Sequence, residues 1–135
     1  MSLDISSLVR ACDRLAEGLE RYQRDISDTQ IRDGLIQRFE FTYEISHKIL
    51  KRYLESIAAN PGEYDEIAFA DLIRTGNEHR LLRGNWSDWR DYRSMRGRTS
   101  HTYDEAVALQ VVECIPAFLQ EVQVLLQRLQ ERIKQ

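Results

Sequence analysis

The chain has 135 residues, of which 42% are hydrophobic and 30% charged, and its net charge at pH 7 is −3. This length and composition predict one globular domain over residues 1–135. The negative charge argues against a generally cationic nucleic-acid coat protein, although it allows a local basic site. No uninterrupted run of about 18 apolar residues occurs, so no membrane span is expected.

The N-terminus and the two cysteines point to a cytoplasmic protein. The first residues, MSLDISSLVRACDR, lack the basic lead and the apolar core of a signal peptide. Cys12 and Cys114 are far apart and form no CxxC motif. Each lies on an apolar helical stripe, where a free cysteine behaves as a small buried hydrophobe. We therefore expect both thiols in the core of a protein from a reducing compartment.

Two long helices are predicted in the N-terminal half. Apolar residues recur at alternating spacings of three and four over residues 5–26, which gives one apolar helical face. Asp28 then precedes a second apolar stripe that extends to Ile57. This stripe predicts a helix of about 30 residues, or roughly 45 Å. NPGEYDE at 60–66 combines Asn, Pro and Gly and predicts a loop.

Shorter elements are expected in the middle of the chain. A helix at about 67–75 would stop at Gly76-Asn77, and a further turn or two would follow at 78–83. WSDWRDYRSMR at 86–96 predicts a helix that is capped by Ser87. This helix would end at Gly97, in the left-handed conformation that is common at helix ends.

The last helix is expected at about 102–134, where the apolar stripe is close to heptad spacing. Thr102 and Glu105 have the spacing of a capping box, and Pro116 predicts a kink or a missing backbone hydrogen bond. No strand pattern, repeat or low-complexity tract occurs. The predicted fold class is therefore all-α: an antiparallel up-and-down bundle of about four long helices, with one or two short extra helices.

Positive charge gathers in segment 74–98, which has seven arginines, three acidic residues and no lysine. The planar fork of arginine suits bidentate phosphate recognition, but a solvated helix face explains these charges equally well. Trp86, Trp89 and Tyr92 are interleaved with the arginines and could stack on unpaired bases. Large aromatic residues in a small bundle are more often core anchors, so we expect both tryptophans in the core.

The candidate site is MRGRTSHTYDE at 95–105. His101 is expected at or just before a helix N-terminus, where free N–H groups and the helix dipole favour an anion. Arg96 can reach the same phosphate from the preceding helix. Arg93, Arg98 and Ser100 are further candidates for binding RNA or phosphate, although Ser100 is also a possible helix cap.

These residues suit metal-free RNA cleavage, because the sequence has no acidic cluster to hold a metal. No cofactor is expected. His101 would remove the 2′-hydroxyl proton, and Arg96 would stabilise the charge that develops as the 2′-oxygen attacks phosphorus. One histidine does not comfortably act as both base and acid, which favours a homodimer with a shared cleft. Arg74 and His79 have the same spacing, but the neighbouring caps and arginines favour Arg96 and His101.

FEFTYEISHKILKRYLE at 39–55 and RGRTSHTYDE at 96–105 together resemble the HEPN proteins called nucleotidyltransferase substrate-binding proteins. The resemblance covers most of the chain, including IPAFL at 115–119. It implies a helical bundle that dimerises and places two R-x4-6-H motifs, here Arg96 and His101, in a ribonuclease cleft. It also implies a toxin whose antitoxin is a minimal nucleotidyltransferase (MNT).

The resemblance also gives a role to Tyr103. In similar toxins with an R-x4-6-H-x-Y motif, this tyrosine accepts AMP from the partner, which adds charge and bulk that oppose RNA binding. The position after the motif arginine is usually polar, most often Asn, but here it is Gly97, so a side-chain hydrogen bond is lost. His47 is expected to be structural or to lie at an interface, and His79 to be exposed.

Three functions are compatible with the sequence. The first is a ribonuclease toxin, and the second is a non-catalytic subunit that binds a substrate or nucleotide for the nucleotidyltransferase. The third is a helical scaffold without chemistry at the turn. Gly97 weakens the case for the ribonuclease and leaves the case for the binding subunit intact.

Overall fold

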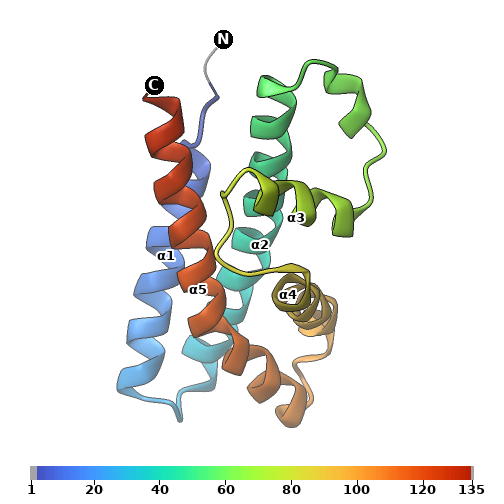
Figure 1. Cartoon of the computed structure of the whole chain (residues 1–135). Coiled ribbons are helices and arrows are strands. Elements are labelled where there is room, and N and C mark those ends of the chain that lie inside the picture. Colours follow the sequence, from blue (N-terminus) through green and yellow to red (C-terminus); the bar gives the residue numbers. More distant parts are fainter. Residues whose placement is uncertain (1–2, 135) are drawn as a thin grey trace.

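The computed structural model describes residues 3–134, which form five α-helices and two short 3-10 helices (Figure 1). The long helices are α1 (Ser6–Arg24), α2 (Thr29–Ile57) and α5 (Glu105–Ile133), and the shorter ones are α3 (Phe69–Glu78) and α4 (Trp86–Arg98). The 3-10 helices are η1 (Pro61–Tyr64) and η2 (Thr99–His101). No described residue belongs to a strand, and the all-α prediction is confirmed.

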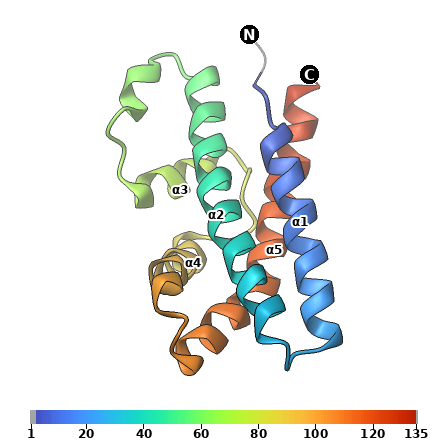
Figure 2. The same cartoon turned by 180° about the vertical axis from the view of Figure 1, so that it is seen from behind.

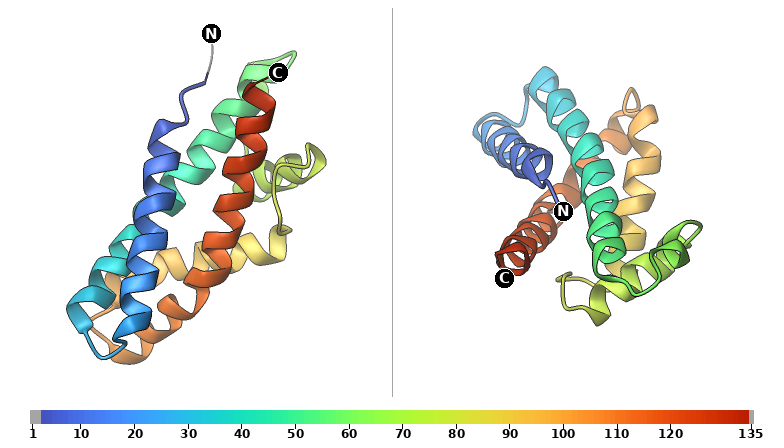
Figure 3. Two further views of the ribbon diagram at one scale, coloured as in Figure 1. Left: turned by 90° about the vertical axis from the view of Figure 1, so that its left-hand side faces the viewer. Right: turned by 90° about the horizontal axis from the view of Figure 1, so that it is seen from above.

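The three long helices pack against one another, and α1 runs antiparallel to both α2 and α5 (Figure 1). α2 lies between α1 on one side and α3 and α4 on the other (Figure 2). α4 crosses the long helices instead of running along them (Figure 3). The last turn of α4 therefore comes to lie against the face of α2 that α1 leaves uncovered.

Among the described residues, three helices begin at side-chain caps. The Asp28 carboxylate, which directly precedes α2, accepts hydrogen bonds from the backbone N–H groups of Gln30 and Ile31. α4 is capped by Asn85 in a capping box with Asp88, and α5 by Asp104.

The predicted caps Ser87 and Thr102 are wrong. Asn85 and Asp104 have the extended backbone that an N-cap needs, whereas the backbone of Thr102 is helical. The Thr102 hydroxyl instead donates to the carbonyl of Thr99. Ser87 lies inside the first turn of α4, and Ser100 lies inside η2 and caps no helix.

The glycine stop signals are also wrong. Gly97 lies inside α4, Gly76 lies inside α3, and no described glycine has a positive φ. After α4 the chain tightens into η2, and the Thr99 N–H donates to the Arg96 carbonyl. Such i→i+3 bonds need no left-handed residue, so the helix can end without glycine. After α3 it is Arg80, with φ of 59°, that adopts the left-handed conformation.

Aromatic side chains form the centre of the core. The fully buried rings of Phe39 and Phe118 meet edge to face with centroids 5.0 Å apart, and Trp89 meets Tyr92 in the same way at 5.5 Å. Trp89 is fully buried, as predicted, whereas Trp86 is half-buried at the edge of the core.

Both cysteines are free and belong to the apolar interior or its margin. Cys12 is buried and Cys114 is half-buried. Burial raises the pKa of each thiol to about 12, so neither is a reactive thiolate near neutral pH. This agrees with the expectation that the two cysteines are core residues.

α5 carries most of its apolar stripe into the core, where Val111, Ile115, Phe118, Val122, Leu125 and Leu129 are fully buried. Pro116 lies inside this helix, as predicted, and cannot donate a backbone hydrogen bond. Within the described part of the chain, α5 is the one helix long and apolar enough to cross a membrane by length and composition alone. In this fold its apolar face packs against α1, α2 and α4.

Polar side chains of α5 hold the linker between α3 and α4. The buried Glu121 carboxylate accepts hydrogen bonds from the N–H groups of Arg83 and Gly84, at 2.8 and 2.7 Å. Arg128 donates to the carbonyls of Arg80 and Leu82, both at 3.0 Å. The entry into α4, and with it the position of the candidate site, therefore depends on α5.

Candidate functional site

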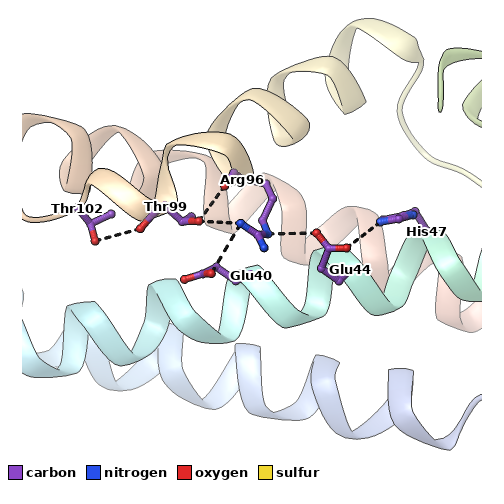
Figure 4. A network of polar contacts seen from close by, with 6 residues as sticks. All are labelled: Glu40, Glu44, His47, Arg96, Thr99 and Thr102. Carbon is purple, nitrogen blue, oxygen red and sulfur yellow. Dashed lines mark hydrogen bonds and ion pairs between the residues drawn. The ribbon is translucent and has the colours of Figure 1, made fainter. Parts of the chain in front are cut away.

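Arg96 projects from the last turn of α4 onto α2 (Figure 4). Its Nε lies 3.2 Å from Glu44 Oε1, and its Nη1 lies 3.7 Å from Glu40 Oε2. Nη1 also donates a hydrogen bond to Thr99 Oγ1 at 3.0 Å, and Thr99 Oγ1 donates to the Arg96 carbonyl at 2.8 Å. The contact with Glu44 is an ion pair without a well-aligned hydrogen bond. Two carboxylates and a threonine thus hold the guanidinium in place.

Glu44 connects Arg96 to His47. The second oxygen of its carboxylate, Oε2, lies 3.4 Å from His47 Nε2 (Figure 4). Burial lowers the pKa of His47, while the neighbouring Glu44 carboxylate acts in the opposite direction. Because the net shift is downward, His47 is mostly neutral at pH 7.

His101 lies on η2 and is exposed. Its Nδ1 lies 3.3 Å from the hydroxyl oxygen of Tyr103, a residue that is 86% exposed. No hydrogen bond among residues 3–134 joins His101 to Arg96, which lies one helical turn earlier in the chain. The structure therefore places the two motif residues on adjacent turns but directs their side chains to different neighbours.

The three further arginine and serine candidates lie in different surroundings. The Arg93 guanidinium lies over the Phe69 ring, 5.1 Å from its centroid, on the same side of α4 as Arg96. Arg98 forms a hydrogen bond with Gln110 of α5. Ser100 is exposed on η2. Only Arg93 is brought beside Arg96.

A surface hollow of about 460 Å³ lies between α2, the start of α3 and α4, and we call it the α2–α4 hollow. α2 contributes Tyr43, Glu44 and His47, and α3 contributes Phe69. Arg93, Arg96 and Gly97 complete it from α4. Among the residues that the structure describes, no group of three or more His, Cys, Asp or Glu is placed to hold a metal ion.

The sequence alone does not identify the residues that pair with Arg96. Glu40, Glu44 and His47 recur at spacings of four and three, which places them on one face of α2. This pattern identifies a polar helix face, but it does not identify the arginine that pairs with it. The sequence does not mark Thr99 either, because its hydrogen bonds depend on the 3-10 turn after α4.

The fold and the site define a class: a small helical bundle with an R-x4-H motif at the turn before its last long helix. Residues 3–131 match the family described as "Nucleotidyltransferase substrate binding protein like". The chain belongs to this family, and the resemblance found in its sequence is confirmed.

The relatives carry two different descriptions. The chain is 42% identical over 107 residues to "Probable ribonuclease HepT" of Haemophilus influenzae, a match over 79% of this chain and 72% of that protein. A solved Haemophilus influenzae structure, described as the fold of a substrate-binding domain of a nucleotidyltransferase, superposes with a TM-score of 0.88. The sequences are 34% identical, and the match covers 94% of this chain and 99% of that one.

A crystal structure from Thermus thermophilus has the same fold. It superposes with a TM-score of 0.70 at 28% identity, over 90% of this chain and 98% of that chain. The helical arrangement is therefore shared across relatives whose sequences differ at more than half of their positions.

Proposed function

We propose that this protein is a cytoplasmic HEPN-type ribonuclease that acts as the toxin of a two-component system with an MNT antitoxin. The relative named "Probable ribonuclease HepT" supports the ribonuclease activity. The structural relative described as a substrate-binding domain of a nucleotidyltransferase supports the association with such an enzyme. RNA is the proposed substrate, and the proposed active unit is a homodimer.

The observation that carries this proposal is the way Arg96 is held. Its Nε and Nη1 are engaged by Glu44, Glu40 and Thr99, while its side chain remains about 33% exposed. Nη2 takes part in none of these contacts. A guanidinium that is fixed before the substrate arrives stabilises developing charge without reorganisation in the transition state. Arg96 therefore suits the stabilisation of a phosphorus centre under attack.

The proposed chemistry needs two copies of His101. In its neutral form, one His101 takes the proton of the 2′-hydroxyl, and the 2′-oxygen attacks the adjacent phosphorus. The bond from phosphorus to the 5′-oxygen breaks, and that oxygen receives a proton from His101 of the partner subunit, which enters the step in its protonated form. The products are a 2′,3′-cyclic phosphate and a 5′-hydroxyl. The exposure of His101 leaves it free to meet a symmetric copy.

Tyr103 is the proposed acceptor of AMP from the MNT partner. The residue is 86% exposed, so another enzyme can reach the hydroxyl, and that hydroxyl lies 3.3 Å from His101 Nδ1. A nucleotide on this oxygen would place a negative phosphate beside His101. Repulsion between this phosphate and the RNA backbone would then inhibit the ribonuclease.

The test is incubation of the purified protein with structured RNA in EDTA. We expect the wild type to cleave the RNA and leave 2′,3′-cyclic phosphate ends, whereas Arg96→Ala and His101→Ala lose cleavage with unchanged helicity. Arg74→Ala is the matched control, because Arg74 belongs to the other arginine–histidine pair and is paired with Asp71 on α3. Strict dependence on added magnesium, or full activity of His101→Ala, would contradict the mechanism.

A non-catalytic binding subunit of the nucleotidyltransferase is the second candidate. It is favoured by the absence of a direct Arg96–His101 contact within the described chain and by Gly97, which replaces the usual polar residue. A folded wild-type dimer that cleaves no RNA would support this function in place of the first.

A further inference from the structure

The α2–α4 hollow has an aromatic wall. The ring centroids of Tyr43 and His47 lie 5.2 Å apart, those of His47 and Phe69 lie 5.6 Å apart, and Tyr43 and Phe69 are separated by 6.2 Å. Tyr43 is buried behind the wall, whereas His47 and Phe69 are only half-buried. A half-exposed group of rings beside a polar surface is the kind of platform on which unpaired bases stack.

Two arginines supply positive charge at the α4 side of this wall. Arg93 is exposed and lies over the Phe69 ring, and Arg96 lies one turn further along the same face of α4. Glu44 is the carboxylate that lines the hollow, and it is paired with Arg96 and faces His47. Glu40 also pairs with Arg96, at 3.7 Å, so the charges of the two arginines and the two glutamates balance. Arg93 takes part in neither ion pair, so its exposed guanidinium is the positive charge most open to an anion such as a phosphate.

Gly97 keeps the hollow open beside Arg96. Glycine inside a helix lowers helix stability, yet neither backbone nor packing requires it here. Its φ is not positive, and a Cβ added at this position would meet nothing within 4 Å. The space that a side chain would fill is therefore free for a ligand in the hollow.

We propose that the α2–α4 hollow binds one nucleotide unit, with its base against His47 and Phe69 and its phosphate on Arg93 and Arg96. The inference rests on the proposed function in one respect, since it takes this unit to be part of a single-stranded RNA next to the cleaved phosphate. A free 5′-nucleotide presents the same base and phosphate. The experiment must therefore compare the binding of RNA with the binding of mononucleotides.

The test measures binding by isothermal titration calorimetry with the full chain. One ligand is a short single-stranded RNA with every 2′-hydroxyl methylated, which blocks attack by the 2′-oxygen and separates binding from cleavage. The other ligands are the four 5′-mononucleotides. We expect Gly97→Leu and Phe69→Leu each to weaken RNA binding by about tenfold or more, because they fill the hollow or remove a stacking ring.

Gly34→Leu is the matched control. Gly34 is also an exposed glycine inside a helix, and a Cβ added there also meets nothing within 4 Å. It lies on α2 but outside the hollow, so Gly34→Leu should bind RNA within about twofold of the wild type. Circular dichroism of all three variants checks that each is folded, and the two glycine variants should keep full helicity.

The possible outcomes test separately the location of the binding site, the identity of its ligand and the proposed nuclease activity. RNA binding by Gly97→Leu as tight as that of the wild type overturns the hollow as the site, as does a wild type that binds neither the RNA nor any mononucleotide. Mononucleotide binding as tight as RNA binding overturns the assignment to RNA. If the wild type and the variants bind the methylated RNA as expected but the wild type does not cleave unmodified RNA, the inference is supported. Only the proposed nuclease activity is then overturned.

Discussion

At the scale of single residues, Arg96 carries its charge between two carboxylates. Glu40 and Glu44 are each about one-third exposed on their side chains, so water screens both ion pairs and an incoming phosphate can compete with them. Their main effect is orientation, because they hold Nε and Nη1 on the α2 side. Thr99 adds a hydrogen bond from Nη1 to an uncharged hydroxyl oxygen, so the negative charge of a phosphate does not repel this partner of Arg96.

Thr99→Val tests this positioning. The change keeps the shape of a buried side chain but removes its hydrogen bonds to Nη1 and to the carbonyl of Arg96. We expect a loss of about 1 kcal/mol in the free energy of unfolding. RNA cleavage should fall by about tenfold, because the guanidinium is held less firmly. Urea unfolding and single-turnover cleavage measure the two effects.

Thr75→Val provides the control for Thr99→Val. The Thr75 hydroxyl donates to the Asp71 carbonyl at 2.8 Å, but it lies on α3 away from Arg96. This variant should lose a similar or smaller amount of stability and cleave RNA at the wild-type rate. Equal cleavage by the two variants would remove Thr99 from the positioning of Arg96.

At the scale of elements, the glycines differ in what surrounds them. Gly97 in α4 and Gly34 in α2 are exposed, and an added Cβ meets nothing near either. A Cβ at Gly84, between α3 and α4, would lie 2.6 Å from Glu121 Oε1 and 2.7 Å from Asp88 Oδ2. Substitution by alanine should therefore raise the stability of the protein at Gly97 and Gly34 and lower it at Gly84.

Alanine substitutions give the sign of each effect. Gly97→Ala and Gly34→Ala should each raise the free energy of unfolding by about 0.5–1 kcal/mol, because alanine is the better helix residue. Gly84→Ala should lower it by about 2 kcal/mol or more, because the methyl group disrupts the buried hydrogen bonds to Glu121. Thermal and urea unfolding check these values, and stabilisation by Gly84→Ala would contradict the close approach.

Glu121 makes the link between α5 and the α3–α4 linker sensitive to pH. Burial raises the pKa of its carboxyl group, with a further contribution from Asp88, while the N–H groups of Arg83 and Gly84 act in the opposite direction. A raised pKa means that the folded protein holds the proton more tightly than the unfolded chain. The stability from this group is therefore greatest below the ordinary glutamate pKa and falls as pH rises through the folded-state value.

Glu121→Gln isolates this contribution, because glutamine does not titrate. The free energy of unfolding of the wild type minus that of the variant should decrease as the pH is raised from about 4 to 7. Urea unfolding at several pH values measures this difference, in which the other carboxyl groups largely cancel. A difference that increases with pH would mean that the amide hydrogen bonds outweigh burial at Glu121.

At the scale of the whole molecule, an apolar strip lies beside Arg96. Phe41, which is 39% exposed, and Ile45 share a surface hollow with Glu40, Glu44 and Arg96. If two copies bring their motifs together in one cleft, this strip is buried between them. The homodimer is thus expected to form through the face of α2 that carries Phe41.

Phe41→Glu tests the dimer. A charge at this position should convert the dimer to a monomer in light scattering and reduce RNA cleavage to less than about a tenth, since burying an unpaired carboxylate is costly. Ile57→Glu is the control, because Ile57 is also exposed but lies at the far end of α2. A wild type that is monomeric at working concentrations would count against the shared cleft.

Local patterns in the sequence were sufficient for much of this fold. The spacing of apolar residues predicted α1, α2 and α5, because burial of one helical face needs only neighbours three and four residues away. The place of Asp28 just before the second stripe also marks the start of α2, which its carboxylate caps. The glycine stops failed, since a 3-10 turn and a left-handed Arg80 end the helices instead, and several local endings are compatible with one sequence.

The candidate site likewise combines features that the sequence predicts with contacts that only the tertiary structure shows. The sequence by itself determined the helical class, the family and the R-x4-H motif of Arg96 and His101, since all of these lie in the order and spacing of residues. Only the tertiary structure decided that Arg96 meets Glu40 and Glu44, about 50 residues earlier in the chain, and that α5 holds the linker into α4. Such contacts depend on how helices cross, which side-chain packing determines and local spacing does not.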